Sequence, residues 1–138
     1  MTTFNERVND QFRANRGNVG AWGSGLVLIH HRGARTGTER INPAMSLTDG
    51  DTWLVVGSAK GAPRDPAWVT NLRANPDTII EAVQGDDVAA VAVRAVELTG
   101  DERSAAFRRF VDMAPAFETY QADAGRILPV IRLVPRRA

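Results

Sequence analysis

The sequence predicts an α+β fold in which a small, mostly antiparallel β-barrel of about six strands carries helices on its outside. Strand-like segments dominate, and short turns rich in Gly and Asp join several of them. No β–α–β unit repeats along the chain, which argues against a doubly wound parallel sheet. The chain has the length of one domain, and we expect residues 1–138 to form a single barrel domain.

The N-terminal segment predicts a helix that packs outside the barrel. Thr3 and Glu6 have the spacing of a capping box, which marks a helix start. The apolar side chains that follow repeat with the period of a helix: Phe4, Val8 and Phe12. Because this apolar stripe is thin, we expect the helix within residues 1–16 to lie on the body of the protein, not inside it.

The remaining elements follow as three strands, a helix, two strands, a helix and a strand. The predicted strands cover residues 26–32, 40–47, 52–57, 78–83, 88–98 and 127–134. The predicted helices cover about 66–75 and 99–113, with a further helical stretch at 116–123 after Pro115.

Individual residues refine these elements. Pro43 within a strand implies an edge or a bulge, because proline cannot donate to the ladder. The DGD sequence at 49–51 predicts a hairpin turn. Asp65 is expected to cap the second helix, with Pro66 as its first residue, and Thr99 with Glu102 forms another capping box.

Composition excludes several classes of function. The chain has no cysteine, so disulfides, cysteine-ligated metals and cysteine nucleophiles are excluded, and we expect a cytoplasmic location. No apolar run reaches the length of a membrane span, and the acidic N-terminus does not look like a signal peptide. A net charge of +1, with basic residues not interleaved with aromatic ones, argues against nucleic-acid binding.

A basic turn follows the first predicted strand. Arg32, Arg35 and Arg40 flank a segment in which Gly33 and Gly37 are free to adopt positive φ. Guanidinium groups bind phosphate and carboxylate oxygens in pairs, so the turn predicts an anion-binding tip. The alternative is a solvated hairpin tip in a chain where Lys60 is the only lysine among 17 basic residues.

A second candidate anion site follows the third strand. In the SAKGAPRDP segment, Ser58 leaves the strand, Lys60 and Arg64 are basic, and Gly61 precedes a helix start. Free N–H groups and the helix dipole favour negative charge at such a position. The alternative is a plain strand-to-helix connection, and the P-loop pattern for nucleotide triphosphates is absent.

Other chemistry-bearing residues are sparse. His30 and His31 are neighbours on a strand and point to opposite faces, so they cannot chelate one metal, and no metal site is expected. Trp68 and Asn71 share one face of a helix, which is usually core. Of the aromatic stripe near the C-terminus, only Tyr120 carries a hydroxyl. No convincing catalytic pair of carboxylates is present, so we expect the chemistry to come from a cofactor.

Three motifs in this order resemble the deazaflavin-dependent nitroreductase family, whose members use coenzyme F-420 on a split β-barrel. They are GARTGTERINPAM, VVGSAKGAPRDPAWVTNLRANP and FETYQADAGRILPVIRL, within a match that extends from about Phe12 to Leu133. The resemblance implies a split β-barrel reductase that transfers a hydride from reduced coenzyme F-420 to an electrophilic apolar acceptor. That acceptor would be a quinone, an activated alkene or a nitroaromatic.

The resemblance also implies a cofactor site. Arg35 and Arg40 would hold the acidic phospholactyl and oligoglutamate tail of the coenzyme, and Thr36 beside them is a further candidate cofactor-binding residue. Further residues would line the phosphate and the ring, or lie beside them: Pro43, Met45, Ser58, Ala59, Lys60, Gly61, Ala62, Trp68 and Asn71. Tyr120 is the candidate proton donor, with solvent as the alternative, and Ser58 is a second candidate catalytic residue.

The chain departs from the family pattern at several positions. Ala34 stands where the family usually has a second basic residue, and the basic residue of the Ser58 loop is displaced by one, to Lys60. Tyrosines that the nitroreductase branch carries near the last strand are represented only by Tyr120, because the matching positions hold Ala114 and Phe117. Tail affinity and nitroreduction are therefore the properties most affected.

Two other functions remain open from the sequence. An FMN-dependent split-barrel reductase or oxidase would need only one phosphate site. A non-catalytic protein that binds or carries deazaflavin would bind without turnover. The expected partner is a small-molecule acceptor. Peripheral membrane contact is not favoured, because Glu6 and Asp10 reduce the positive charge of the first helix's polar face. Either a monomer or a homodimer is compatible with the sequence.

Overall fold

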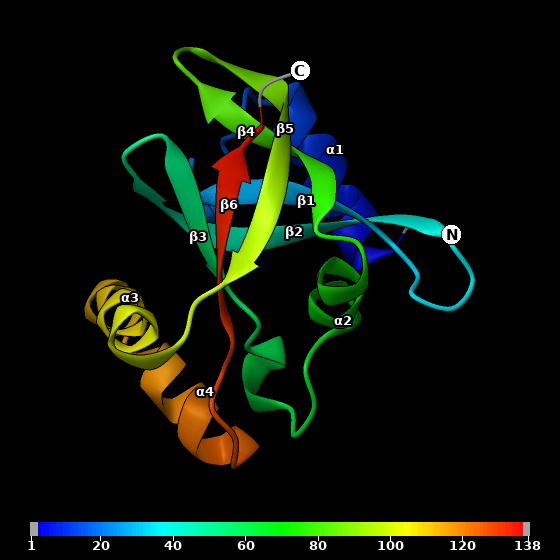
Figure 1. Cartoon of the computed structure of the whole chain (residues 1–138). Coiled ribbons are helices and arrows are strands. Elements are labelled where there is room, and N and C mark those ends of the chain that lie inside the picture. The colour runs from blue at the N-terminus through cyan, green and yellow to red at the C-terminus, as the bar shows by residue number, and fades with distance from the viewer. Residues whose placement is uncertain (1–2, 137–138) are drawn as a thin grey trace.

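Six antiparallel strands close into a barrel in the computed structural model, which describes residues 3–136 (Figure 1). Around the barrel the order is β1-β2-β3-β6-β5-β4. The strands are β1 (Leu26–Arg32), β2 (Glu39–Asp49), β3 (Thr52–Val56), β4 (Asp77–Gln84), β5 (Asp87–Glu97) and β6 (Val130–Pro135). The predicted fold class, a small antiparallel barrel with flanking helices, is confirmed.

Helices fill the connections and lie outside the barrel wall. They are α1 (Phe4–Ala14), α2 (Ala67–Ala74), α3 (Gly100–Met113) and α4 (Ala116–Ala124), with short 3₁₀ turns η1 (Gly20–Trp22) and η2 (Ala59–Gly61). In Figure 1, α3 and α4 lie together below β3 and β6, whereas α1 lies behind β1. No helix of the described chain is long and apolar enough to cross a membrane.

The barrel interior is apolar because alternate residues of each strand point inward. Its core joins side chains of all six strands with one face of α2, and includes Ile29, Val55, Ile80, Trp68 and Leu72. A second cluster buries the outer face of β3 and β6 under α3 and α4. A third packs Val8 and Phe12 of α1 against Leu26 and Leu28 of β1, so α1 lies outside the barrel.

The local signals at turns and helix ends agree with the structure in most places. The DGD segment forms the β2–β3 turn, and Gly85 with Asp86 forms the β4–β5 turn. The backbone N–H of Glu6 donates to Thr3 Oγ1 at 3.1 Å, as the capping box predicts.

Two capping predictions are wrong. Asp65 does not cap α2, which begins at Ala67 with Pro66 before it. Its carboxylate instead accepts charge-assisted hydrogen bonds from Arg126 and Arg73, which are stronger than a bond from a backbone amide. Thr99 does precede α3, but its side chain makes no capping hydrogen bond.

Strand β2 has different neighbours along its two halves. Residues 39–45 pair with β1, and residues 46–49 pair with β3. Beyond this point β3 continues beside β6, where Val56 pairs with Val130. The two strands therefore diverge, and Pro43 lies in the half of β2 that has a neighbour on one side only, as its edge prediction requires.

Candidate functional site

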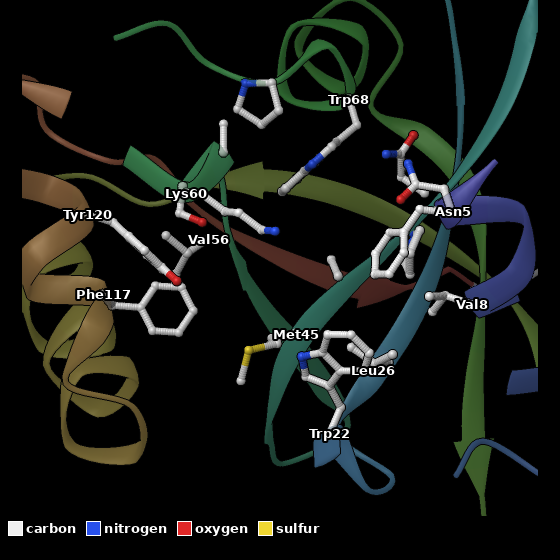
Figure 2. Close-up of a pocket in the computed structure, with 17 residues that line it drawn as sticks. Asn5, Val8, Trp22, Leu26, Met45, Val56, Lys60, Trp68, Phe117 and Tyr120 are labelled. Atoms are coloured by element: carbon white, nitrogen blue, oxygen red, sulfur yellow. The ribbon is translucent and has the colours of Figure 1, made fainter. Parts of the chain in front are cut away.

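A largely apolar cavity of about 430 Å³ opens where β2 and β3 diverge (Figure 2). Its walls come from α1, η1, β2, the segment after β3, the start of α2, and α4. The lining residues are Phe4, Asn5, Val8, Trp22, Leu26, Asn42, Pro43, Ala44, Met45, Val56, Ser58, Ala59, Lys60, Pro66, Trp68, Phe117 and Tyr120. Its size suits a ring system with a few polar contacts, which is typical of a cofactor or small-molecule site.

The structure divides the residues predicted for the site into three groups. Those that line the cavity are Pro43, Met45, Ser58, Ala59, Lys60, Trp68 and Tyr120. Those exposed at the β1–β2 loop and the start of β2 are Arg35, Thr36 and Arg40. The others, Gly61, Ala62 and Asn71, do not line the cavity and support the segments that do.

The segment that follows β3 has an unusual backbone. Ala59 and Lys60 have φ values of 45° and 53°, and Gly61 has 87°. Left-handed conformations cost about 1–3 kcal/mol at a non-glycine residue, so the surrounding structure must hold this turn in place. A turn that passes from the right-handed conformation of Ser58 to the left-handed region points successive N–H groups toward one spot, which is an anion-binding arrangement.

Two contacts hold the strained turn. A Cβ on Gly61 would lie 3.3 Å from the carbonyl oxygen of Tyr120, a tight contact, and the φ of 87° also favours glycine where the turn approaches α4. Arg126, at the end of α4, donates to the carbonyl oxygens of Ala62 at 3.1 Å and Arg64 at 2.9 Å. Its Nη1 also lies 2.6 Å from Asp65 Oδ1. The guanidinium of Arg126 thus holds the chain directly after the turn, from Ala62 to Asp65.

Lys60 and Tyr120 supply polar groups to the cavity. Figure 2 shows the Lys60 side chain extending into the opening between Trp68 and Val56. The ring of Tyr120 packs edge-on against Phe117, with the ring centroids 5.8 Å apart. Within the described part of the chain, neither the Lys60 amine nor the Tyr120 hydroxyl has a hydrogen-bond partner, so both are available to a ligand.

Unpaired positive charge gathers around this site. Most of the described arginines form ion pairs of 3.9 Å or less, among them Arg13, Arg73, Arg94, Arg108, Arg109, Arg126, Arg132 and Arg136. Basic groups of the described chain without such a pair are found on the β1–β2 loop and the segment after β3, and at two other places: Arg32, Arg35, Arg40, Lys60 and Arg64, and then Arg16 after α1 and Arg103 of α3. The first five lie on the two segments for which the sequence predicts anion binding, whereas the guanidinium of Arg103 donates to uncharged oxygens inside the protein.

The β1–β2 loop is ordered by its own hydrogen bonds. Thr36 Oγ1 accepts from the backbone N–H of Thr38 at 3.2 Å. Gly37 has φ of 71°, as predicted. Gly33 does not have positive φ, and here the prediction is wrong; a Cβ at this position would lie 2.7 Å from Thr36 Oγ1, so another residue would require the Thr36 side chain to move. The loop extends beyond the barrel on the side of α2 (Figure 1).

A buried chain of polar side chains connects this loop to the cavity. The backbone nitrogen of Ala34 lies 3.0 Å from Asn71 Oδ1, and Asn71 Nδ2 lies 2.9 Å from His31 Nδ1. His31 Nε2 lies 2.8 Å from Oδ1 of Asn42, which lines the cavity. His31 and Asn71 are 3% and 7% exposed. Burial lowers the pKa of His31, although its hydrogen bond to Asn42 acts in the opposite direction.

His30 faces the other side of β1, as predicted for neighbours on a strand. Its Nε2 lies 2.8 Å from Glu81 Oε2, and the same carboxylate takes two hydrogen bonds from Arg13 of α1. The bond from Arg13 lowers the pKa of Glu81. Neither histidine lines the cavity, and the described residues contain no cluster of side chains that would hold a metal ion.

Several residues of the site were not found from the sequence. Phe4 and Trp22 form an edge-to-face pair at the cavity wall, although Phe4 was expected to serve only the packing of the first helix. The roles of Asn42 and Arg126 depend on partners 11 and 61 residues away in the chain. No local pattern signals such contacts.

The matching family model and two similar proteins point to the same family. The family model described as F420H(2)-dependent quinone reductase matches residues 5–135. An F420H(2)-dependent quinone reductase of Mycobacterium tuberculosis is 32% identical over 136 residues, covering 94% of this chain and 89% of the relative. Another protein of that organism, provisionally given the same name, is 38% identical over 110 residues, covering 80% of this chain and 89% of its own.

Two solved structures share the fold of this chain. A solved F420-H2-dependent reductase has a TM-score of 0.68 and 31% identity, covering 79% of this chain and 93% of its own. A chain solved as a domain-swapped dimer has a TM-score of 0.70 and 28% identity, covering 93% of this chain and 94% of its own.

We expect Arg126→Ala to lower the free energy of unfolding by about 2–3 kcal/mol, because the half-buried carbonyl oxygen of Ala62 and carboxylate of Asp65 lose a charged donor. Arg108→Ala is the matched control, since Arg108 pairs only with Asp112 on the surface and should change stability by less than about 0.5 kcal/mol. Urea denaturation measures both. Equal losses in the two variants would contradict the role given to Arg126.

His31 should titrate below its ordinary value of about 6.5. The folded protein then binds fewer protons than the unfolded chain as pH falls below about 6.5, so the free energy of unfolding decreases over that range and does not change from this source above it. An NMR titration of the ring gives the pKa, and His31→Gln should reduce the slope of stability between pH 7 and 5.5. A pKa at or above 6.5 would contradict this reading.

Proposed function

The chain belongs to the F420H(2)-dependent quinone reductase family, and on that premise we propose that the cavity between β2 and β3 is where it transfers a hydride from reduced coenzyme F-420 to a quinone. The protein is an oxidoreductase, and coenzyme F-420 is its cofactor. An FMN-dependent enzyme, the other cofactor class considered from the sequence, finds no support in this family.

The placement of the cofactor rests on one observation. Basic side chains without an ion-pair partner lie at the wall of the largely apolar cavity and on the neighbouring β1–β2 loop. Coenzyme F-420 has a flat aromatic ring system with a few polar edge groups at one end and a phospholactyl and oligoglutamate tail at the other. The cavity is large enough for the ring but not for the tail as well. Lys60 lies at the wall, and Arg35 and Arg40 lie outside, where a tail that leaves the cavity would meet them.

The residues of the two basic segments are assigned to the tail and the phosphate. Arg35 and Arg40 bind the carboxylates, because guanidinium groups without an internal partner lose no ion pair when they bind. The turn formed by Ser58, Ala59 and Lys60 binds the phosphate, since its N–H groups and the amine offer positive charge at one place. Thr36 acts indirectly, by shaping the loop.

The apolar lining holds the ring and keeps water away from it. Pro43 and Met45 come from β2, and Trp68 from the start of α2, so that they face the cavity from different sides. The reduced deazaflavin ring supplies a hydride from a ring carbon to the acceptor. Exclusion of water by the lining favours this transfer, which needs the reacting atoms at about 3–3.5 Å.

Tyr120 is the proposed proton donor to the reduced quinone, because its hydroxyl lines the cavity and has no partner among the described residues. Ser58 is the second hydroxyl of the lining and is assigned to the phosphate or to the acceptor oxygen. Activated alkenes and nitroaromatics remain alternative acceptors predicted from the sequence. A non-catalytic carrier would bind the coenzyme without turnover, so an activity assay distinguishes the two.

One position, Ala34, lowers the positive charge of the β1–β2 loop relative to the family pattern. Ala34 lacks a basic side chain, and its backbone N–H is already bound to Asn71. We therefore place the tail on Arg35 and Arg40 without a third guanidinium between them. We also propose a cytoplasmic location, because the sequence has no cysteine. The proposed oligomeric state is a monomer or a homodimer.

Arg35→Ala should weaken coenzyme binding about 5- to 10-fold at low salt, because one exposed charge-assisted contact is lost. The dependence of Kd on salt should also become less steep. A fluorescence titration with the oxidised coenzyme measures both, and Arg108→Ala, which removes an equal charge elsewhere, is the control. Identical binding curves for Arg35→Ala and the parent would argue against a tail site on this loop.

The parent protein should oxidise the reduced coenzyme when a quinone is supplied, and FMN should not replace the coenzyme. Tyr120→Phe should lower kcat about 10- to 100-fold while the coenzyme Kd stays the same, since only the proton donor is removed. Stopped-flow absorbance of the coenzyme follows the reaction. Unchanged turnover in the variant would assign the proton to solvent, and binding without any turnover would support the carrier.

A further inference from the structure

Hydrogen bonds connect the β1–β2 loop to the cavity through the side chains of Asn71, His31 and Asn42. One group at the end of this series can act only as a donor, and it fixes which atom donates and which accepts in every bond. The backbone N–H of Ala34 can only donate, so the Asn71 atom 3.0 Å away must be the side-chain oxygen. The other end of that amide, Nδ2, then faces His31 Nδ1 at 2.9 Å. Because Nδ2 can only donate, His31 Nδ1 must be unprotonated and accept.

The tautomer of His31 follows from this. A neutral imidazole with a bare Nδ1 carries its proton on Nε2. Burial favours the neutral ring, and the charges of Arg40 and His30 nearby act in the same direction. The proton on Nε2 is donated across 2.8 Å to Asn42, and the accepting atom must be Oδ1.

The last amide of the chain is therefore oriented with its nitrogen free. Asn42 Oδ1 is bound to His31, and Asn42 Nδ2 forms no hydrogen bond with any described residue. Asn42 lines the cavity together with Asn5 of α1 and Trp68 of α2. A donor with no internal partner, held by side chains that are nearly fully buried, is available to a hydrogen-bond acceptor of the ligand, such as a carbonyl oxygen.

We infer that Asn42 is a binding residue that donates its amide N–H to a carbonyl oxygen of the bound ring, and that His31 and Asn71 are the residues that position it. This inference rests on the proposed function and extends it. The carbonyl belongs either to the pyrimidine part of the deazaflavin ring or to the quinone. Since Asn71 also accepts a hydrogen bond from Ala34, the same hydrogen bonds link the position of the β1–β2 loop to the orientation of the Asn42 amide.

Asn42→Asp provides the most direct test, because it replaces the N–H₂ group with an oxygen of nearly equal size. We expect it to weaken binding of the deazaflavin riboside, which lacks the phosphate and the tail, about 10-fold, and of the whole coenzyme by the same factor. Asn42→Ala should have a similar effect. Asn18→Asp, which makes the same change in charge at an exposed position outside the cavity lining, is the control and should leave both Kd values unchanged.

The positioning role needs its own readout. His31→Leu should also weaken riboside binding, yet the double variant with Asn42→Ala should bind no more weakly than Asn42→Ala alone, because both changes remove one contact. Nitrogen NMR of the parent should show a proton on His31 Nε2 and none on Nδ1. If His31→Leu does not fold, the NMR result and the Asn42 variants still decide the matter.

The outcomes separate the possibilities. A loss of riboside affinity in Asn42→Asp places the carbonyl on the cofactor, whereas unchanged riboside binding with a raised KM for the quinone places it on the acceptor. If neither changes while the parent binds the coenzyme, the inference is overturned and the proposed function stands. A proton on Nδ1, or additive losses in the double variant, overturns the positioning role. A parent that binds no coenzyme overturns both proposals.

Discussion

The divergence of β2 from β3 is the constraint on which the site depends. Each strand follows a different neighbour, β1 in one case and β6 in the other, so the sheet opens between residues 39–45 and the segment after Val56. An open strand edge leaves room for a ligand, and helices α1 and α4 wall it off at two sides. Pro43 is compatible with such an edge because it has no N–H to leave unpaired.

The basic side chains near this opening differ in their partners from most of those in the rest of the described chain. Most of the arginines that hold the body of the protein together pair with a carboxylate, as Arg13 does with Glu81 and Arg132 with Asp49. The basic groups at the opening and on the adjacent loop lack such partners, as Arg35 and Lys60 do. A stable fold has no need of these unpaired groups, whereas an anionic ligand does. The strained turn at Ala59 and Lys60, held by Arg126, is consistent with a site that keeps its shape in advance of binding.

The sequence predicted the barrel and much of the site because both depend on local signals. Alternating apolar residues, glycine turns and the capping box at Thr3 locate the elements, and the three motifs locate the loops that carry Arg35 and Lys60. Contacts between distant segments were out of reach. The local sequence predicts a helix cap at Asp65, whereas its actual partner, Arg126, lies 61 residues further along the chain. Asn71 was expected to be core, and its bonds to Ala34 and His31 depend on how α2 sits against the barrel.

A crystal structure of the protein with oxidised coenzyme F-420 bound tests the central claim most directly. The account predicts the ring between Pro43, Met45 and Trp68, the phosphate on the turn at Ser58 to Lys60, and the tail along Arg35 and Arg40. A structure in which the coenzyme occupies another surface, with these arginines extended into solvent and the cavity between β2 and β3 empty, would contradict it.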